Sequence, residues 1–194
     1  AFFGAGNNPA KMGSMQFLNL LYSKFPGKTY PVHPREKTVF GLPAWPSVAD
    51  LPEVPDLAIL VLPANVIPDV LGELGEKGTR HAVIISAGFN EVGDGGQENE
   101  ARLQAVCQKY DIRFIGPNCM GVMNTTHPFN CTVAPFFGPP GKLGMIAQSG
   151  TYVGQIIEFL KKRGINFSKA ISTGNESSID LVDCLDYLGD DDET

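Results

Sequence analysis

Residues 1–13 read AFFGAGNNPAKMG, and this stretch decides the fold class of the chain. Phe2 and Phe3 are expected to form a strand, the loop at 4–13 is rich in glycine, and an apolar repeat of helical period follows. Glycines let a backbone approach a phosphate closely, and the first turn of a helix attracts negative charge. The loop begins like the pattern G-x-G-x-x-G but has Pro9 in place of the third glycine. It is either a phosphate-binding loop or a tight turn that joins a strand to a helix without a ligand.

Short apolar runs that predict buried strands recur along the chain. They occupy residues 29–32, 57–62, 82–85, 112–115, 143–147 and 167–171. Stretches of helical period separate these runs, and one of them is a helix expected at 65–77. Four other helices are expected from apolar faces formed by Met15, Leu18, Leu21, Tyr22 and Phe25; by Leu103, Val106, Cys107 and Tyr110; by Val153, Ile156, Ile157 and Leu160; and by Leu181, Val182, Leu185 and Leu188. Strands that alternate with helices form a parallel sheet covered on both faces, so we expect an α/β fold.

Two proline-rich stretches interrupt this rhythm. Residues 34–55 hold five prolines and are expected to form a loop with one short helical turn near Ser47. Residues 117–141 show no clear period and are expected to be a crossing loop or linker. We therefore expect a first domain over residues 1–138 and a second over 139–194. The second holds only two predicted strands, and the first strand of the chain is short, so we expect a piece of a longer polypeptide.

The composition excludes several classes of protein. Apolar residues make up 43% of the 194 positions and charged residues 19%, which is typical of a globular protein and not of a disordered one. With 15 Lys and Arg against 21 Asp and Glu, the net charge is −6, so we expect no nucleic-acid surface. No apolar run approaches the ~20 residues of a membrane span. The four cysteines and three histidines make no zinc signature, and so few cysteines favour the cytoplasm.

The end of the second predicted strand carries the sequence HPREK at 33–37. A site for NAD favours an acidic residue here, because a carboxylate binds the ribose hydroxyls. Arg35 and Lys37 instead suit an additional phosphate, as on the phosphorylated ribose of NADP or coenzyme A, although Glu36 lies between them. The alternative is a charged turn that is only solvated.

Five further loops follow predicted strands, at the edge where parallel sheets bind ligands. They are residues 62–65, 86–90, 116–121, 147–151 and 172–178. Small residues in these loops admit an extended ligand, and Ser149 with Gly150 offers hydroxyl and N–H groups to an anion at a helix start. Ser86 and Ser149 have an alternative role, which is to cap a helix or turn.

Candidates for a reactive side chain are few. Cys119 has no basic neighbour in the sequence, so we expect it to pack in the core rather than react. None of His33, His81 and His127 has a neighbour that marks a catalytic base, and all three are expected to be structural or solvent-exposed. The sequence therefore offers loops that could bind a ligand, but no candidate nucleophile.

Seven motifs, taken in order along the chain, resemble one family. They are GAGNNPAKMG (4–13), YPVHP (30–34), GLPAWPSV (41–48), SAGF (86–89), GPNCMG (116–121), QSG (148–150) and GN (174–175). Together they resemble the α-subunit region of nucleoside-diphosphate-forming acyl-CoA synthetases, the ADP-forming acetyl-CoA synthetases that are related to succinyl-CoA synthetase. The family has Ser in place of Gly6 and often Asn in place of His33.

The resemblance implies a Rossmann-like CoA-binding domain followed by the start of a flavodoxin-like, succinyl-CoA synthetase-like subdomain. Such enzymes convert acyl-CoA, ADP and phosphate to a carboxylic acid, CoA and ATP through an acyl phosphate and a phosphohistidine. The resemblance puts that histidine beyond Thr194, so no catalytic residue is expected in this segment. ATP or ADP with Mg²⁺ is expected on an ATP-grasp region, in the same chain or in another subunit of an oligomer. CoA or acyl-CoA is the ligand expected here.

By the same resemblance, a set of residues is expected to bind CoA: Gly6, Asn7, Asn8, Pro9, Lys11, Arg35, Lys37, Pro63, Ala64, Ser86, Ala87, Gly88 and Asn118. Ser149 and Gly150 are expected to hold phosphate or the phosphohistidine. The loop at 4–13 and the basic turn, residues 35–37, would take the nucleotide end of CoA, and residues 86–88 its pantetheine arm. Two alternatives stay open, an NADP-dependent oxidoreductase and a non-catalytic CoA-sensing regulatory domain, as in family members fused to acetyltransferases.

Overall fold

The computed structural model describes residues 1–135 and 138–194, and its first half is built on a parallel sheet. Five strands lie in the order β2-β1-β5-β6-β7, and every neighbouring pair is parallel. Their bounds are Phe2–Phe3 (β1), Pro31–Val32 (β2), Ala58–Leu60 (β5), His81–Ile84 (β6) and Arg113–Ile115 (β7). The strands expected from the apolar runs of this half are confirmed to within two residues at each end.

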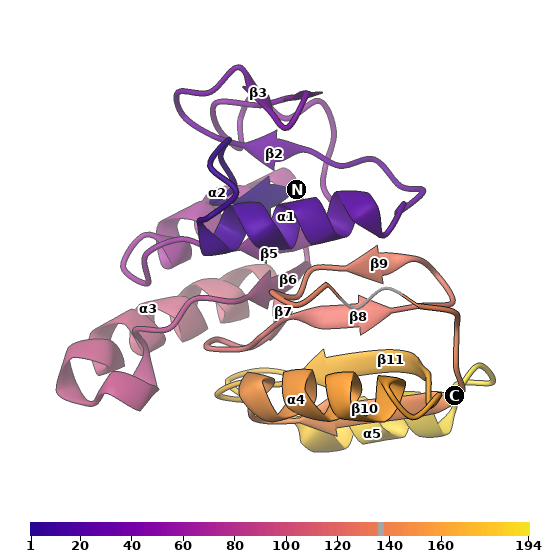
Figure 1. Cartoon of the computed structure of the whole chain (residues 1–194). Helices are drawn as coiled ribbons and strands as arrows, with labels where there is room; N and C mark the ends of the chain where they lie inside the picture. The colour runs from indigo at the N-terminus through magenta and orange to yellow at the C-terminus, as the bar shows by residue number, and fades with distance from the viewer. Residues whose placement is uncertain (136–137) are drawn as a thin grey trace.

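Helices cover both faces of this sheet (Figure 1). They are α1 (Met12–Tyr22), α2 (Ile67–Lys77) and α3 (Asp94–Tyr110), with a short 3₁₀ helix η1 at Asn90–Val92. Successive strand residues point to opposite faces. Phe3 and Leu60 therefore pack under α2 and α3, whereas Phe2 and Ile59 pack under α1. Gly78 ends α2 in the left-handed conformation that glycine adopts readily.

The second half carries a mixed sheet in the order β10-β11-β8-β9. β10 (Leu143–Ala147) and β11 (Phe167–Ser172) are parallel, whereas β8 (Val122–Asn124) runs antiparallel to β11 and β9 (Phe129–Asn130) antiparallel to β8. Helix α4 (Gly150–Lys161) packs Val153 and Ile157 onto this sheet. Helix α5 (Leu181–Gly189) lies beside β10 (Figure 1).

The expected linker at 117–141 is wrong over its central part, because β8 and β9 lie inside it. These strands are three and two residues long, too short to show an alternating pattern, and prolines surround them. The second sheet consequently has four strands where the sequence indicated two. Residues 136 and 137 of that stretch lie outside the described residues. The boundary at 138/139 stays a prediction, and the second sheet draws strands from both sides of it.

The buried face of α1 also differs from the expected one. Met15, Tyr22 and Phe25 are exposed, and the helix instead buries a mixed face that includes Gln16 and Phe17. Polar side chains become core residues here because they donate hydrogen bonds to main-chain carbonyls, a feature that hydropathy does not register.

Residues 34–55 contain a hairpin that the prolines obscure. β3 (Thr38–Val39) pairs antiparallel with β4 (Leu42–Pro43). The helical turn expected near Ser47 is a single turn, closed by a hydrogen bond from the N–H of Leu51 to the carbonyl of Val48 (3.2 Å). The hairpin matters for the site because it supports the basic turn next to the glycine-rich loop.

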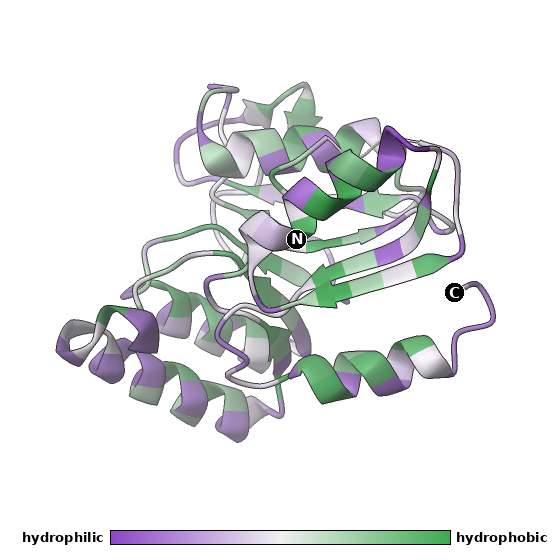
Figure 2. Ribbon diagram, turned by 60° about the horizontal axis from the view of Figure 1, so that its bottom comes forward, coloured by the Kyte–Doolittle hydropathy of each residue, from purple (hydrophilic) through white to green (hydrophobic). Residues whose placement is uncertain are grey.

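The apolar face expected on α5 is formed but is not covered within the described chain. Leu181, Val182 and Leu185 are exposed, and the helix buries Cys184. Figure 2 shows α5 at the front of the molecule, with much of its ribbon coloured as hydrophobic. Its N-terminus is fixed by a capping box in which Asp180 and Asp183 exchange hydrogen bonds with each other's backbone N–H.

Candidate functional site

The glycine-rich loop crosses the carboxyl end of the first sheet at very close range. Gly4 has a φ of +95°, and a Cβ there would lie 2.0 Å from the carbonyl oxygen of Val61. A Cβ on Gly13 would lie 2.4 Å from the carbonyl oxygen of Gly4. Both contacts require glycine, because no side chain fits at such distances. The glycines thereby set the loop and the start of α1 directly over β5.

Ser14 fixes the middle of this loop from the first turn of α1. Its buried hydroxyl accepts a hydrogen bond from the N–H of Gly6 (3.1 Å) and donates one to the Gly6 carbonyl (2.9 Å). Within the described chain, no side chain caps the N-terminus of α1 and its first turn holds no acidic residue. The positive end of the helix is therefore available to an anion that approaches over the loop.

Asn7 joins the loop to the basic turn. Its amide donates to Glu36 Oε2 (3.2 Å) and to the carbonyl of Thr38 (2.8 Å), and its Oδ1 accepts from the N–H of Phe40 (2.9 Å). The carboxylate of Glu36 is thus directed to Asn7. Within the same turn, Arg35 and Lys37 are exposed to solvent.

His33 lies between this turn and the loop. Its Nδ1 accepts the N–H groups of Arg35 (3.2 Å) and Glu36 (3.0 Å), so a neutral imidazole carries its proton on Nε2. A Cβ on Gly6 would lie 3.8 Å from that Nε2. The histidine is half-buried and has a structural role in shaping the turn, as the sequence analysis expected.

Glu91 organises the loop after β6. Its carboxylate accepts the N–H groups of Gly88 and Phe89 and the side-chain amide of Asn175, whose Oδ1 accepts from the Asn118 amide (3.2 Å). Burial by itself would raise the pKa of Glu91, but these hydrogen bonds hold it below its ordinary value. Three loops that follow β6, β7 and β11 are thereby connected.

A cleft of about 700 Å³ opens between the carboxyl ends of the first sheet and the N-terminus of α4. The residues that line it come from both halves of the chain: Met12, Val61, Ile85, Ser86, Ala87, Asn118, Cys119, Met120, Val133, Ala134, Gly150, Thr151, Gly154 and Gln155. No charged side chain is among the described residues that line it. The cleft suits a ligand that is extended, uncharged and largely apolar along this part of its length.

The predicted site residues fall into two clusters on the same edge of the first sheet. Ser86, Ala87, Asn118 and Gly150 line the cleft together. The loop residues Gly6, Asn7, Asn8, Pro9 and Lys11 lie outside the cleft, and Asn7 connects their loop to the turn that carries Arg35 and Lys37. Pro63, Ala64, Gly88 and Ser149 do not line it either. Ser149 caps α4 by accepting a hydrogen bond from the N–H of Tyr152 (3.4 Å), and a Cβ on Gly88 would contact Ala64 at 2.9 Å.

Several residues that line the cleft were not found from the sequence. Gly154 and Gln155 lie one helical turn beyond Gly150, so the period of α4 was a usable signal for them. Val133 and Ala134 had no such signal, because they follow β9 in the stretch interpreted as a linker.

The cysteine beside the cleft is unreactive. Burial raises the pKa of Cys119 to about 12, and its Sγ donates to the carbonyl of Ile84 (3.3 Å). A thiol with this pKa stays protonated near neutral pH and packs as an apolar residue. His81 and His127 are both exposed, as expected, and His127 Nε2 lies 3.7 Å from Glu193 Oε2.

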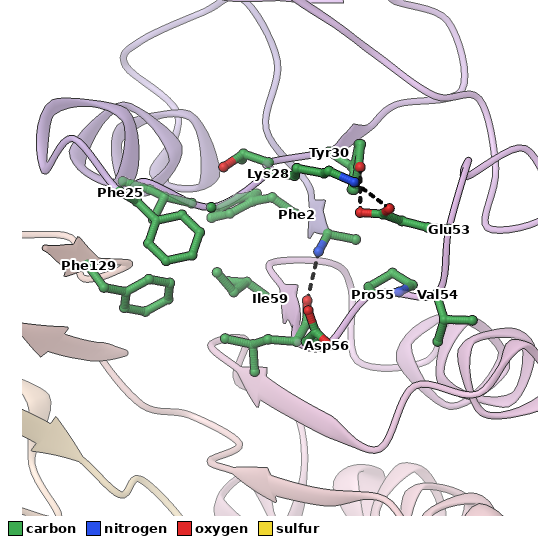
Figure 3. A pocket seen from close by; sticks show the side chains of 15 residues that line it. Phe2, Phe25, Lys28, Tyr30, Glu53, Val54, Pro55, Asp56, Ile59 and Phe129 are labelled. Carbon is green, nitrogen blue, oxygen red and sulfur yellow. Dashed lines mark hydrogen bonds and ion pairs between the residues drawn. The ribbon is translucent and has the colours of Figure 1, made fainter. Parts of the chain in front are cut away.

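A second cavity of about 360 Å³ lies at the opposite, amino-terminal edge of the sheet (Figure 3). Glu53 there accepts hydrogen bonds from Lys28 (2.6 Å) and from the hydroxyl of Tyr30 (2.7 Å). Figure 3 shows Lys28, Tyr30 and Glu53 together, and the charges of Lys28 and Glu53 are paired with each other. Ligands of parallel sheets bind at the carboxyl edge, so the cleft beside α4 is the stronger candidate.

Comparison with known proteins gives matches to both halves of the chain. The family described as "CoA binding domain" matches residues 1–125, and the family described as "succinyl-CoA ligase like flavodoxin domain" matches residues 140–194. None of the helices over the described residues has the length and apolar character that crossing a bilayer requires.

Relatives of known name align with the whole chain. An ADP-forming acetate–CoA ligase of Methanocaldococcus jannaschii is 41% identical over 194 residues, all of this chain and 27% of the relative. The α subunit of the ADP-forming acetate–CoA ligase II of Pyrococcus furiosus is 42% identical over 193 residues, or 42% of its length. One solved structure is described as a dinucleotide forming acetyl-coenzyme A synthetase 1 of Ca. Korarchaeum cryptofilum in complex with phosphate and ADP. It is 33% identical to this chain and superposes with a TM-score of 0.94. The match covers 100% of this chain and 41% of that one. The chain thus spans less than half the length of these relatives.

Proposed function

This chain belongs to the CoA binding domain family, and from that membership we propose that it is the part of an ADP-forming acyl-CoA ligase that binds CoA and presents its thiol. The observation that carries the proposal is the cleft that joins the loops after β6 and β7 to the start of α4. A ligand that enters there touches both halves of the chain, and the relatives that align with both halves are ligases.

The cluster of the glycine-rich loop and the basic turn fits the nucleotide end of CoA. The open start of α1 and the side chains of Lys11, Arg35 and Lys37 supply positive charge for phosphate groups. Gly6 leaves space beside His33, since a Cβ there would meet the imidazole and no other group within 4 Å. These features fit a phosphorylated nucleotide better than the ribose hydroxyls of NAD, which call for a carboxylate.

The cluster and the cleft lie along the same carboxyl edge of the first sheet. The basic turn follows β2 and the cleft lies over the ends of β5, β6 and β7, which are further along the same sheet. With strands ~4.8 Å apart, β2 and β7 are separated by about 19 Å. An extended pantetheine arm laid across Ser86 and Ala87 would bring the CoA thiol to Asn118 and Gly150. Ser149 and Gly150, at the start of α4, would then hold a phosphate or phosphoryl group near that thiol.

The whole ligase would extend well beyond this chain. We assign to it the conversion of acyl-CoA, ADP and phosphate to a carboxylic acid, CoA and ATP, with the phosphorylated histidine outside residues 1–194. ATP or ADP with Mg²⁺ would bind an ATP-grasp region, in the same polypeptide or in another subunit of a cytoplasmic oligomer. The chain's own contribution is to bind CoA, to orient its thiol and to exclude water from the cleft.

Isothermal titration of the chain with CoA, NADP and NAD tests the proposal. We expect saturable binding of CoA and a clear preference for it over both dinucleotides. A preference for NADP would instead support an NADP-dependent oxidoreductase, and the CoA proposal would be abandoned. A CoA-sensing regulatory domain would also bind CoA. Phosphotransfer from labelled ATP in the presence of an ATP-grasp partner, using the full-length protein, separates a ligase from such a sensor.

A further inference from the structure

The main chain of Met120 supports the start of α4. Met120 is buried and lines the cleft. A Cβ on Gly150, the first residue of α4, would lie 2.6 Å from the Cβ of Met120 and 3.1 Å from its nitrogen. Because no side chain fits at such distances, the glycine packs directly against this backbone. A shift of Met120 would therefore move the start of α4 with it.

Ser172, the last residue of β11, holds Met120 from the second half of the chain. Its fully buried hydroxyl accepts a hydrogen bond from the N–H of Met120 (3.1 Å) and donates one to the carbonyl of Gln148 (3.4 Å). The N–H of Ser172 donates to the carbonyl of Gly121 (3.2 Å). Gln148 directly precedes the N-cap of α4. One serine thus ties the loop after β7 to the residues that begin α4.

Helix α1 holds the same residue from the first half of the chain. The amide of Gln16 donates to the carbonyls of Met120 (3.4 Å) and Cys131 (3.1 Å). Gln16 is fully buried, on a face where a helix of a globular protein usually places apolar residues. Its polar side chain is explained by the two carbonyls that the amide holds in place, because buried carbonyls are stabilised when they accept hydrogen bonds.

These contacts set the spacing between two helix starts. Helix α1 begins beside the glycine-rich loop and α4 begins beside the cleft, and both are joined to the backbone of Met120. A ligand that is bound at both helix starts needs this spacing to be kept, because a displacement of about 1 Å is enough to weaken a well-oriented contact severely. The side chains that hold Met120 therefore control the geometry of the site from outside it.

We propose that Ser172, together with Gln16, is a positioning residue that sets the start of α4 at the thiol end of bound CoA. The inference rests on the proposed function, because it assumes that CoA reaches the cleft. Neither side chain lines the cleft, so both act through the backbone of Met120 and not by contact with the ligand.

The test compares the affinities of the chain for CoA and for 3′-phospho-ADP, which is CoA without its pantetheine arm, by titration calorimetry. Ser172→Ala leaves the buried N–H of Met120 without its partner, so this backbone and the start of α4 should shift. We expect CoA to bind about tenfold more weakly and 3′-phospho-ADP to stay within about twofold of wild type. Ser172→Cys should give an intermediate loss, because sulfur is a weak hydrogen-bond acceptor.

Ser168→Ala is the matched control. Ser168 is also a fully buried serine of β11, but its hydroxyl contacts that of Thr194 (2.8 Å) and not the backbone of Met120. This variant should lose stability in the manner of Ser172→Ala and should leave both affinities unchanged. A role of Ser172 in stability alone would make the two variants behave alike.

A second variant approaches Met120 from α1, in case Ser172→Ala does not fold. Gln16→Met removes the amide that holds the Met120 carbonyl and should give the same selective loss of CoA affinity. Asn19→Leu, on the same helix, removes only a hydrogen bond to the carbonyl of Thr132 and should leave both affinities unchanged. Circular dichroism confirms that each variant is folded.

The outcomes separate this inference from the proposed function. Equal losses for CoA and 3′-phospho-ADP in the folded variants, or an unchanged affinity for CoA, would overturn the inference and leave the proposed function intact. Failure of the wild type to bind CoA would remove the proposed function, and the inference with it.

Discussion

The side-chain amide of Asn175 donates a hydrogen bond to the carboxylate of Glu91, which lies 84 positions earlier in the chain. The same carboxylate accepts the N–H groups of Gly88 and Phe89. One exposed acid therefore ties the loop proposed to bind pantetheine to a loop of the second sheet. Because of this connection, the rigidity of the loop at 86–90 depends on the loop after β11, at the edge where the cleft opens.

We expect Glu91→Gln to loosen the loop at 86–90, because a neutral amide accepts hydrogen bonds less strongly and its NH₂ faces other donors. Hydrogen exchange of the Gly88 amide should accelerate.

The lowered pKa of Glu91 sets the pH range of this contact. Its stabilising effect is present above the ordinary pKa of 4.5 and is lost as pH falls through the lower folded value, so wild-type exchange protection should decline in acid. Asn175→Ala should add little to Glu91→Gln, and additive effects would show that the two residues act separately.

The basic turn should recognise a phosphate. Replacing Arg35 and Lys37 together by Ala should weaken CoA more than dephospho-CoA, which lacks the 3′-phosphate. A charge-assisted contact contributes roughly 1.5–3 kcal/mol, so we expect on the order of a tenfold loss or more for CoA. Titration calorimetry measures both affinities. An equal loss for the two ligands would assign the turn to another part of the nucleotide. Replacing Lys162 and Arg163 together by Ala, just beyond α4, removes the same charge and serves as the control.

The glycine-rich loop should tolerate no side chain at its start. Gly4→Ala forces a Cβ to within 2.0 Å of the Val61 carbonyl at a positive φ, so we expect a loss of about 3 kcal/mol or more in the free energy of unfolding. Gly95→Ala is the matched control, because a Cβ on Gly95 meets no atom within 4 Å and the residue lies in α3. That variant should be neutral or more stable by up to about 1 kcal/mol. Urea unfolding compares the two, and a mild effect of Gly4→Ala would mean that the loop moves freely.

A buried ion pair should govern acid stability. Lys169, whose side chain is 4% exposed, donates to Asp191 (2.6 Å) and Glu193 (3.2 Å). Burial by itself would lower the pKa of Lys169, but these hydrogen bonds raise it, and the bond from Lys169 lowers the pKa of Asp191. A carboxyl with a lowered folded pKa stabilises the fold above its unfolded pKa and loses that contribution as pH falls through the folded value.

Urea midpoints measured from pH 7 to pH 2 should therefore fall most steeply below about pH 4 in the wild type. Asp191→Asn should be less stable at pH 7 and should show a flatter decline. Glu158→Gln removes the exposed pair with Lys162 and should leave the pH profile unchanged. Parallel profiles for wild type and Asp191→Asn would show that the pair contributes nothing to the acid transition.

Much of the first half could be predicted from its sequence. The run at 57–62 is apolar without interruption, as a strand buried on both faces must be, and Gly78 marks a helix end that requires a left-handed residue. The closeness of the glycine-rich loop to Arg35 and Lys37 also followed, because neighbouring parallel strands end at one edge. The resemblance to ligases, carried by seven motifs in order, agrees with the full-length alignments.

The other parts of the fold and of the site depend on contacts between residues far apart in the sequence, and such contacts leave no local pattern. β8 becomes a strand because β11 offers it a hydrogen-bonding edge, and three residues cannot show that in advance. Gln16 is buried because distant carbonyls accept from it, which inverts the expected face of α1. Val133 and Ala134 line the cleft from a stretch after β9 that has no periodic pattern, so no local signal marked them.

The pairing of β8 with β11 bears on how such a protein can be divided or recombined. β8 precedes residue 138 and β11 follows it, so neither side contains a complete second sheet. A polypeptide cut at Gly138 would yield two fragments with matching unpaired edges, and these should recombine by fragment complementation when mixed. For the same reason, a chimera that carries residues 140–194 of a homologue should fold only if the β11 of the homologue can pair with this β8. The second half is therefore expected to need the first half to complete its sheet.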